Sequence, residues 1–178
     1  MKEIELNQER MDGGRLGWTN GFLVNHLYGL NDLLTKHCKP DYEVLEVGSN
    51  NGVSSQLIAS HCCHLTCIDP TITQRLRDVA VGAGNITLLQ QRSNDFLPNT
   101  DSKYDLIYID ADHTYNSLTY DITHSLPLLT DRGFVCGHDY TRCFPGCMRA
   151  VNEAFSQIEI FSDSSWVGIV SGSHGQHK

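Results

Sequence analysis

The sequence predicts an α/β fold built on a doubly wound, mostly parallel sheet of seven strands. Short apolar runs alternate with segments whose apolar residues recur three and four positions apart, as on one face of a helix. Strict alternation of this kind, with apolar strands, is typical of a parallel sheet covered on both faces. Two short apolar runs near the C-terminus lie only a few residues apart. They indicate a hairpin, which would add one antiparallel strand.

Each element can be assigned to a range of residues. Five strands are expected before the hairpin, at 42–48, 64–69, 86–91, 104–110 and 133–139. The two strands of the hairpin itself would span 158–162 and 166–171. The turn 92–95 should follow the third strand. Helical spacing predicts helices over 21–37, 53–61, 72–84 and 115–129, and a last one that contains Met148, Val151 and Phe155.

Length and composition limit the class of protein. The chain of 178 residues fits one domain. Its net charge of −8 argues against a nucleic-acid binder, and no segment approaches the ~20 apolar residues of a membrane helix. The first ten residues are charged and lack the apolar core of a signal peptide. We therefore expect a cytoplasmic protein with reduced thiols, a main domain over 41–171 and a flexible tail over 172–178.

Polar residues follow four of the predicted strands. In an open α/β sheet, ligands bind beyond the carboxyl ends of the strands, where the strand order reverses. A single acid at such a position can instead cap the next helix. Four strand ends at one edge favour a ligand site, and their residues are Glu46 to Gly48, Asp69, Asp110, and His138 with Asp139.

The loop after the first strand, "VLEVGSNNGVSS", differs from a dinucleotide loop. Such a loop would need glycine at positions 48, 50 and 53, but this chain has Asn50 and Val53 at the last two. Asn50 can still make the sharp turn because asparagine tolerates a left-handed conformation. Gly48 and Gly52 would leave room for a bulky, uncharged group near the backbone.

Asp69 narrows the choice of ligand. It lies 21 residues after Gly48, where its two carboxylate oxygens could accept hydrogen bonds from two ribose hydroxyls. The expected ligand is therefore a nucleoside without phosphate, and S-adenosylmethionine fits this description.

Four sequence blocks carry a resemblance to a known family. The spacing Glu46-x-Gly48-x-Asn50-x-Gly52 resembles the first motif of class I S-adenosylmethionine-dependent methyltransferases, with Asn50 in place of the middle glycine. "YDLIYIDADHTYNSLTYDI", "LPLLTDRGFVCGHDY" and "PGCMRAVNEAF", with a closing Trp-x-Gly at 166–168, are similar to small single-domain methyltransferases related to sugar O-methyltransferases of antibiotic pathways. The resemblance covers roughly 40–170 and implies a Rossmann-like fold.

The resemblance also implies roles for individual residues. The loop after the first strand would line the methionine part of the cofactor, Asp69 would hold the ribose, and Asp110 would sit at the reactive centre. The segment 1–40, with the leading helix, and the final helix would supply the acceptor pocket. The implied cofactor-binding residues are Glu46, Gly48, Ser49, Asn50, Gly52, Asp69, Pro70 or Thr71, Ser93, Asn94 and Asp110.

Methyl transfer to a hydroxyl requires loss of the hydroxyl proton. Either a base takes the proton or a divalent cation lowers the hydroxyl pKa. The candidates at two adjacent strand ends are Asp110, Asp112, His113, His138 and Asp139. Asp112 has a simpler alternative, which is to cap the helix that follows it.

The metal assignment follows from the resemblance. Related metal-dependent O-methyltransferases place one acid after the fourth strand and an acidic or amide pair after the fifth. Asp110 and Asp139 match this pattern and His138 stands in the remaining place, which implies a magnesium or manganese site. A histidine base without a metal is the alternative.

The predicted function is S-adenosylmethionine-dependent methylation of a hydroxyl on a small molecule, such as a sugar or a phenol. No nucleic acid and no membrane is expected as a partner. Two alternatives remain open at this stage. The chain could be a non-catalytic binding module with a methyltransferase fold, or a dinucleotide-dependent oxidoreductase.

Overall fold

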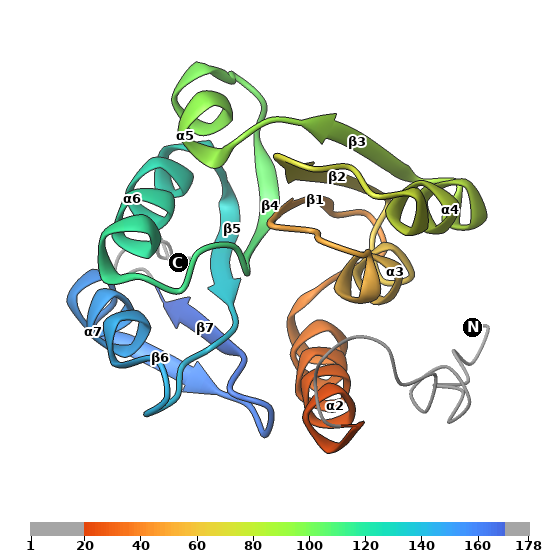
Figure 1. The fold of residues 1–178 in the computed structure, drawn as a ribbon. Coiled ribbons are helices and arrows are strands. Elements are labelled where there is room, and N and C mark those ends of the chain that lie inside the picture. Colours follow the sequence, from red (N-terminus) through yellow and green to blue (C-terminus); the bar gives the residue numbers. More distant parts are fainter. Residues whose placement is uncertain (1–19, 170–178) are drawn as a thin grey trace, which may run out of the picture.

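The computed structural model describes the backbone of residues 20–169 and the side chains of residues 28–169. It confirms the predicted sheet, whose seven strands lie in the order β3-β2-β1-β4-β5-β7-β6 (Figure 1). The first five strands pair in parallel, and β7 pairs antiparallel with β5 on one side and β6 on the other. The strands are β1 (Glu43–Val47), β2 (His64–Asp69), β3 (Ile86–Gln90), β4 (Tyr104–Ile109), β5 (Leu129–Gly137), β6 (Gln157–Ile160) and β7 (Trp166–Ile169).

Helices cover both faces of the sheet, as Figure 1 shows. One face packs against α2 and α3, and the other packs against α6 and α7. Two short 3-10 turns, at Leu97–Asn99 and Leu126–Leu128, complete the connections. The helices are α2 (Asn20–His37), α3 (Val53–Ala59), α4 (Gln74–Ala83), α5 (Ser93–Phe96), α6 (Tyr115–Ser125) and α7 (Pro145–Ala154).

Strand β4 lies at the centre of the sheet and contributes side chains to two separate hydrophobic cores, one on each face. All six of its residues are buried. Leu106 and Tyr108 belong to the core under α2 and α3, whereas Ile107 and Ile109 belong to the core under α6 and α7. Alternate side chains of a strand point to opposite faces, so an almost continuously apolar strand supplies both cores.

The strand order reverses between β1 and β4. From β1 the chain proceeds outward through β2 and β3, and it then returns to add β4 on the other side of β1. The residues that follow these strands stay in register, since Gly48 N–H donates to Ile68 O, Asp110 N–H to Val47 O and His138 N–H to Ile109 O. The ends of the central strands therefore form one continuous edge, at the position where ligands bind in such sheets.

Three expected elements differ from the structure. The helix predicted over 115–129 ends at Ser125, and β5 begins at Leu129 rather than at residue 133. Pro127 has no N–H to continue the helical ladder, so the chain turns through a 3-10 segment first. The segment 92–95, expected as a turn, contributes to the four-residue helix α5.

The leading helix α2 is fixed to the C-terminal hairpin. Asp163, between β6 and β7, accepts a hydrogen bond from Leu30 N–H at 2.7 Å. A Cβ at Gly29 would lie 2.0 Å from Asp163 Oδ1, so the helix approaches the hairpin closely only because residue 29 is glycine. No helix in the described part of the chain is long and apolar enough to cross a membrane. Residues 1–19 of the predicted acceptor segment, and the tail predicted over 172–178, lie outside the described residues.

Candidate functional site

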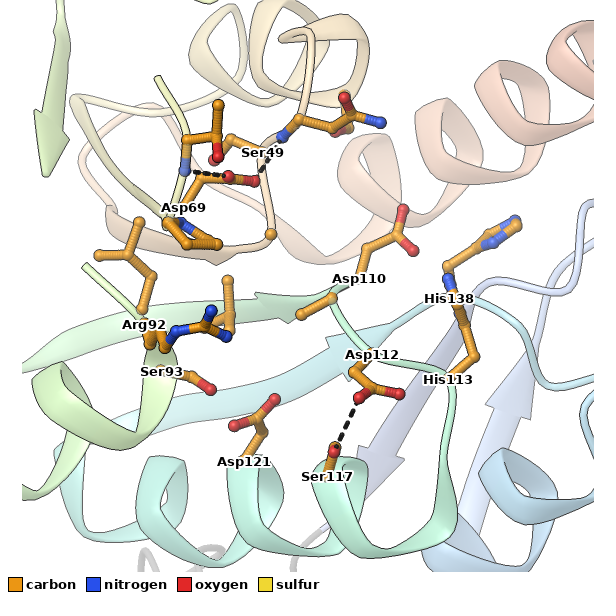
Figure 2. Close-up of a pocket in the computed structure, with 18 of the residues that line it drawn as sticks. Ser49, Asp69, Arg92, Ser93, Asp110, Asp112, His113, Ser117, Asp121 and His138 are labelled. Atoms are coloured by element: carbon orange, nitrogen blue, oxygen red, sulfur yellow. Dashed lines mark hydrogen bonds between the residues drawn. The ribbon is translucent and has the colours of Figure 1, made fainter. Parts of the chain in front are cut away.

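A cleft of about 880 Å³ lies at the edge formed by the carboxyl ends of β1 to β5 (Figure 2). It is lined by the loops that follow these strands and by one side of α6. Of the predicted cofactor-binding residues, those that line it are Gly48, Ser49, Asn50, Asp69, Pro70, Thr71, Ser93, Asn94 and Asp110.

The loop between β1 and α3 makes three left-handed steps. Gly48, Asn50 and Gly52 have φ values of 90°, 45° and 77°. A Cβ at Gly48 would lie 2.4 Å from the main-chain oxygen of Asp110, and one at Gly52 would lie 3.0 Å from Leu76 Cδ1. The expectation that Gly52 leaves room for a ligand is therefore wrong, whereas Gly48 lines the cleft and its role toward a ligand stays a prediction. Gly48 lets β1 approach the end of β4, and Gly52, which does not line the cleft, packs against α4.

Glu46 does not line the cleft either, which corrects the role expected for it. Its carboxylate is fully buried beneath the loop. It accepts hydrogen bonds from Ser54 Oγ at 2.5 Å, from Ser55 Oγ and from Cys67 Sγ at 3.2 Å. Burial raises the pKa of Glu46, and the serine hydroxyls oppose this shift. Its structural role is to join β1 to the first turn of α3 and to β2.

Ser49 has an unused polar atom at the cleft. The residue is 2% exposed, and its Oγ has no hydrogen-bond partner of normal geometry among the described residues. A buried hydroxyl without a partner costs free energy, of the order of 1–3 kcal/mol, unless a ligand or water completes it. The position is therefore suited to a polar group of a bound molecule.

Asp69 joins the end of β2 to the loop after β1. Its Oδ2 accepts the main-chain N–H of Asn50 at 2.9 Å, and its Oδ1 accepts that of Thr71 at 2.8 Å. An ionised carboxylate has about four acceptor positions, so each oxygen can accept one more hydrogen bond. The carboxylate is thus held in a fixed orientation, and its two oxygens can still accept the two hydrogen bonds expected from a ribose.

Asp110 follows β4 and lies half-buried in the cleft. Burial raises the pKa of Asp110 to about 6, Asp139 adds to the shift, and the imidazoles of His138 and His113 oppose it. A carboxyl with such a pKa changes its protonation near neutral pH, which is common at functional sites.

The side chain of Asp139 is bound by two imidazoles. It forms an ion pair with His113 Nδ1, from the loop after β4, and its Oδ1 lies 3.1 Å from His138 Nδ1. Burial would raise the pKa of Asp139, but these two contacts hold it well below its usual range. The bond to Asp139 raises the pKa of His113. Burial would lower the pKa of His138, yet the carboxylates of Asp139 and Asp110 raise it.

The candidate metal group differs in one member from the expected set. One ligand atom each from Asp110, His113 and Asp139 lie within 4.8 Å of one another. His138 is not in this group, although it lines the cleft as His113 does, and its side chain is 3% exposed whereas that of His113 is 39% exposed. The donor set of two carboxylates and an imidazole fits a divalent cation such as manganese.

Asp112 is held at the start of α6. Its carboxylate accepts Thr114 N–H at 3.0 Å and Ser117 Oγ–H at 3.1 Å. The bond from Thr114 lowers the pKa of Asp112. The N-cap of α6 is Thr114, so Asp112 does not cap the helix itself but binds the cap residue and Ser117 of the first turn.

One buried acid of the cleft was not among the residues predicted from the sequence. Asp121, on α6, is 2% exposed and lines the cleft opposite Ser93 (Figure 2). Its position in the middle of a helix carries no strand-end signal. The only available signal was a polar residue on the helix face that also carries Leu118 and Ile122, which are buried.

The cleft lies at the reversal of strand order in a doubly wound sheet, which is where such sheets bind ligands, and Asp69 and the loop after β1 line it. A sequence model described as a methyltransferase domain matches residues 45–140, which is more than half of the chain. The chain belongs to this family of methyltransferase domains. Its fold is that of the class I S-adenosylmethionine-dependent methyltransferases.

Solved structures share this fold at low sequence identity. The ribosomal protein L11 methylase of Lactobacillus delbrueckii subsp. bulgaricus is 17% identical with a TM-score of 0.61, over 86% of this chain and 79% of that one. The N-methyltransferase NodS of Bradyrhizobium japonicum WM9 is 19% identical with a TM-score of 0.60, over 83% and 94% of the two chains. No curated protein sequence matches the chain.

A third structure was solved with a ligand. SMU.776, which is described as a methyltransferase, is complexed with SAH. It is 13% identical with a TM-score of 0.62, over 82% of this chain and 48% of that one. Sequence identities of this size support a shared fold. They do not identify the methyl acceptor, which depends on the residues of the site.

Proposed function

We propose that this chain transfers a methyl group from S-adenosylmethionine to a hydroxyl group of a small molecule. One observation carries the proposal. Asp110, His113 and Asp139 gather carboxylate and imidazole atoms at the end of the cleft next to Gly48. A group of this composition can orient a hydroxyl and accept its proton. A methyl acceptor that is more nucleophilic than a hydroxyl would not need a base of this kind.

The cleft offers the polar groups that the cofactor needs. Asp69 is oriented by two main-chain N–H groups and can accept the ribose hydroxyls. The unpartnered hydroxyl of Ser49 can donate to the methionine carboxylate. Pro70, Thr71, Ser93 and Asn94 would then surround the base, because β3 ends beside β2 at Gln90.

The reactive end acts mainly by positioning. Methyl transfer from a sulfonium is an in-line displacement, so alignment of donor and acceptor supplies much of the rate. The hydroxyl proton is taken by His113 when no cation is present. Asp139 accepts from His113 Nδ1, which fixes the ring and leaves Nε2 as the atom that accepts the proton.

A divalent cation at Asp110, His113 and Asp139 forms the second part of the proposal. When bound there, such a cation would lower the pKa of the acceptor hydroxyl. The protein's contribution is the donor set, in which β4 presents Asp110, the following loop presents His113, and β5 presents Asp139. Because the His113–Asp139 ion pair must open to admit a cation, binding would release the imidazole proton.

The acceptor is proposed to be a small molecule, such as a sugar or a phenol. The net charge of −8 opposes binding to a polyanion such as RNA. The fold does not select the acceptor, since the structural neighbours include a ribosomal protein methylase and an N-methyltransferase. The leading helix and the loop 140–146 are the proposed acceptor side.

Calorimetric titration with S-adenosylhomocysteine tests the cofactor site. The wild-type protein is expected to bind, and Asp69→Asn is expected to bind about 10- to 100-fold more weakly because one ribose hydroxyl loses a charged acceptor. Asp101→Asn is the matched control, since Asp101 is an exposed acid that precedes β4 at the opposite edge of the sheet. Absence of binding to the wild type at millimolar ligand would contradict the proposal.

Titration with manganese, followed by electron paramagnetic resonance, tests the cation site. Asp110→Asn is expected to weaken manganese binding at least about tenfold. Asp112→Asn, two residues away and bound to the cap residue Thr114, should bind like the wild type. Equal manganese binding by all three proteins would leave His113 as a base without a metal. Identification by mass spectrometry of small molecules released from the denatured protein would separate an enzyme from a binding module.

A further inference from the structure

Trp166 begins the closing Trp-x-Gly motif, which the reaction proposed above does not use. It is the first residue of β7, which pairs antiparallel with β5 (Figure 1). Its side chain is fully buried and is not among those that line the cleft. The indole Nε1–H nevertheless donates a hydrogen bond of 3.0 Å to the main-chain oxygen of His138, the first residue after β5. The motif therefore contacts the chain directly before Asp139.

Two glycines make room for the aromatic rings around this hydrogen bond. A Cβ at Gly137 would lie 2.8 Å from Trp166 Cζ2, so residue 137 must be glycine for the indole to occupy its position. The ring of Phe155 packs against the indole, with the two centroids 5.8 Å apart. A Cβ at Gly168 would lie 2.5 Å from Phe155 Cδ1. The glycine of the motif thus admits the phenyl ring that packs against the tryptophan of the motif.

The backbone of Asp139 is left-handed, with a φ of 65°. Residues other than glycine seldom adopt this conformation, and it persists where surrounding contacts fix it. Both peptide groups that flank Asp139 are bound to the hairpin of β6 and β7. The preceding group accepts the bond from Trp166 through the His138 oxygen. The following group donates from Tyr140 N–H to Ser164 O at 3.0 Å. These two bonds fix the direction in which the Asp139 side chain leaves the main chain.

The direction of the Asp139 side chain brings the reactive groups together. Its carboxylate forms the ion pair with His113 Nδ1. It also belongs, with Asp110 and His113, to the group whose ligand atoms lie within 4.8 Å of one another. A rotation of the peptide before Asp139 would turn the carboxylate away from His113, because one Cα carries both the side chain and the main-chain bonds.

We infer that Trp166 is a positioning residue for the reactive end of the cleft. Its N–H group, bound to the main chain directly before Asp139, directs the Asp139 carboxylate toward His113. The inference rests on the proposed function, because that function supplies the reaction for which the carboxylate is positioned. An indole suits this role, since it combines a large packing surface with a single hydrogen-bond donor.

A double-mutant cycle on the full chain tests the inference. Benzothienylalanine at position 166 replaces the indole N–H by sulfur and keeps the shape of the ring, so mainly the hydrogen bond is lost. His113→Phe removes the partner of Asp139 and keeps a ring against Phe144. Urea unfolding at about pH 6, where the ion pair is charged, gives the midpoints of the four proteins. The shift caused by His113→Phe should fall to about half or less when the donor at position 166 is absent.

Val151→Ala is the matched control. Val151 is fully buried in the same core as Trp166, but it lies on α7. Its truncation should lower the urea midpoint and leave the shift caused by His113→Phe as large as in the wild type. Trp166→Phe, which loses the same N–H and part of the ring, should reproduce the result of benzothienylalanine. An equal His113→Phe shift with and without the indole N–H would overturn the inference, because the indole would then stabilise the fold by packing alone.

Manganese affinity gives a second measurement, which a loss of packing alone would not change. Benzothienylalanine at position 166 should weaken manganese binding at least about threefold, and Val151→Ala should leave it unchanged. An unchanged affinity in the benzothienylalanine protein would overturn the inference.

The inference can fail separately from the proposed function. The urea midpoints require neither metal nor cofactor, so they decide the role of Trp166 even if the wild type does not bind manganese. Absence of S-adenosylhomocysteine binding to the wild type would overturn the proposed function. A reduced His113→Phe shift would in that case still show that Trp166 directs Asp139.

Discussion

The imidazole of His113 and the carboxylate of Asp139 form an ion pair between the loops that follow β4 and β5. The two residues are far apart in the sequence and meet because these strands are neighbours in the sheet. Asp139 has a φ of 65°, which turns the chain sharply directly after the strand and directs its carboxylate toward both His113 and His138. The pair lies at the end of the cleft that we propose as the reactive end.

The ion pair predicts a pH-dependent contribution to stability. The pKa of His113 is raised, so its contribution is fully present below about pH 6.5 and is lost as the pH rises through the folded-state pKa. The pKa of Asp139 is lowered, so its contribution is present above about pH 4 and is lost in stronger acid. Asp139→Asn, which keeps a residue that tolerates φ 65°, should therefore destabilise the protein most between about pH 4 and 6.5.

Urea unfolding of the wild type and Asp139→Asn from pH 4 to pH 9 measures this difference. The loss of unfolding free energy in the variant should shrink above about pH 7, as His113 loses its proton. If the loss of unfolding free energy in Asp139→Asn is the same from pH 4 to pH 9, the stabilisation by the pair does not depend on the protonation of His113.

Gly48 and Gly84 provide a matched pair of left-handed glycines. Their φ values are 90° and 79°, but a Cβ at Gly48 would meet the Asp110 main chain at 2.4 Å, whereas one at Gly84 would have nothing within 4 Å. Gly84→Ala should cost about 1 kcal/mol of unfolding free energy from backbone strain. Gly48→Ala should cost at least about 2 kcal/mol more, because β1 and β4 must separate. Thermal or urea unfolding compares the two, and equal losses would contradict the close approach of these strands.

Glu46 is predicted to stabilise the fold through its buried contacts. Glu46→Ala leaves the hydroxyls of Ser54 and Ser55 and the thiol of Cys67 without their acceptor, which should cost about 3 kcal/mol of unfolding free energy. The control is Glu43→Ala on the same strand, where the side chain is exposed and the change should stay within about 0.5 kcal/mol. If both variants unfold at the same urea concentration, the buried network does not stabilise the protein.

Asp121 also predicts a pH effect, with a sign opposite to that of Asp139. Its folded-state pKa of about 6 lies above the ordinary value of 3.8, so ionisation between these values favours the unfolded chain. The effect lowers the unfolding free energy by up to roughly 3 kcal/mol between pH 4 and pH 7. Asp121→Asn should therefore gain stability relative to the wild type over this interval, as measured by urea unfolding. A difference that does not change with pH would show that the carboxyl titrates normally.

Several parts of the site could be predicted from the sequence because they depend on local order. Asp69 is the last residue of β2 and Asp110 directly follows β4, and parallel strands bring such residues to one edge. Asn50 was expected to make a sharp turn, and its φ of 45° confirms this expectation. The role of its side chain toward a ligand stays a prediction.

Other parts could not be predicted, for a common physical reason. Glu46 was assigned to the ligand because it belongs to a binding motif, but alternation along β1 directs its side chain toward α3. The group of residues that could hold a cation contains His113 rather than His138, and the sequence pattern did not show that the loop after β4 brings His113 beside Asp139. Asp121 faces the cleft only through the packing of α6 beside α5.

The sequence by itself determined the α/β class, the parallel sheet, the single antiparallel strand and the edge where the ligand site lies, because periodicity and strand order encode them. The tertiary structure decided which polar side chains face the cleft and which are buried beneath it. That choice depends on contacts between segments distant in the chain, such as Glu46 with Cys67 and His113 with Asp139. Such contacts leave no periodic pattern in the sequence, because each depends on the placement of two elements at once.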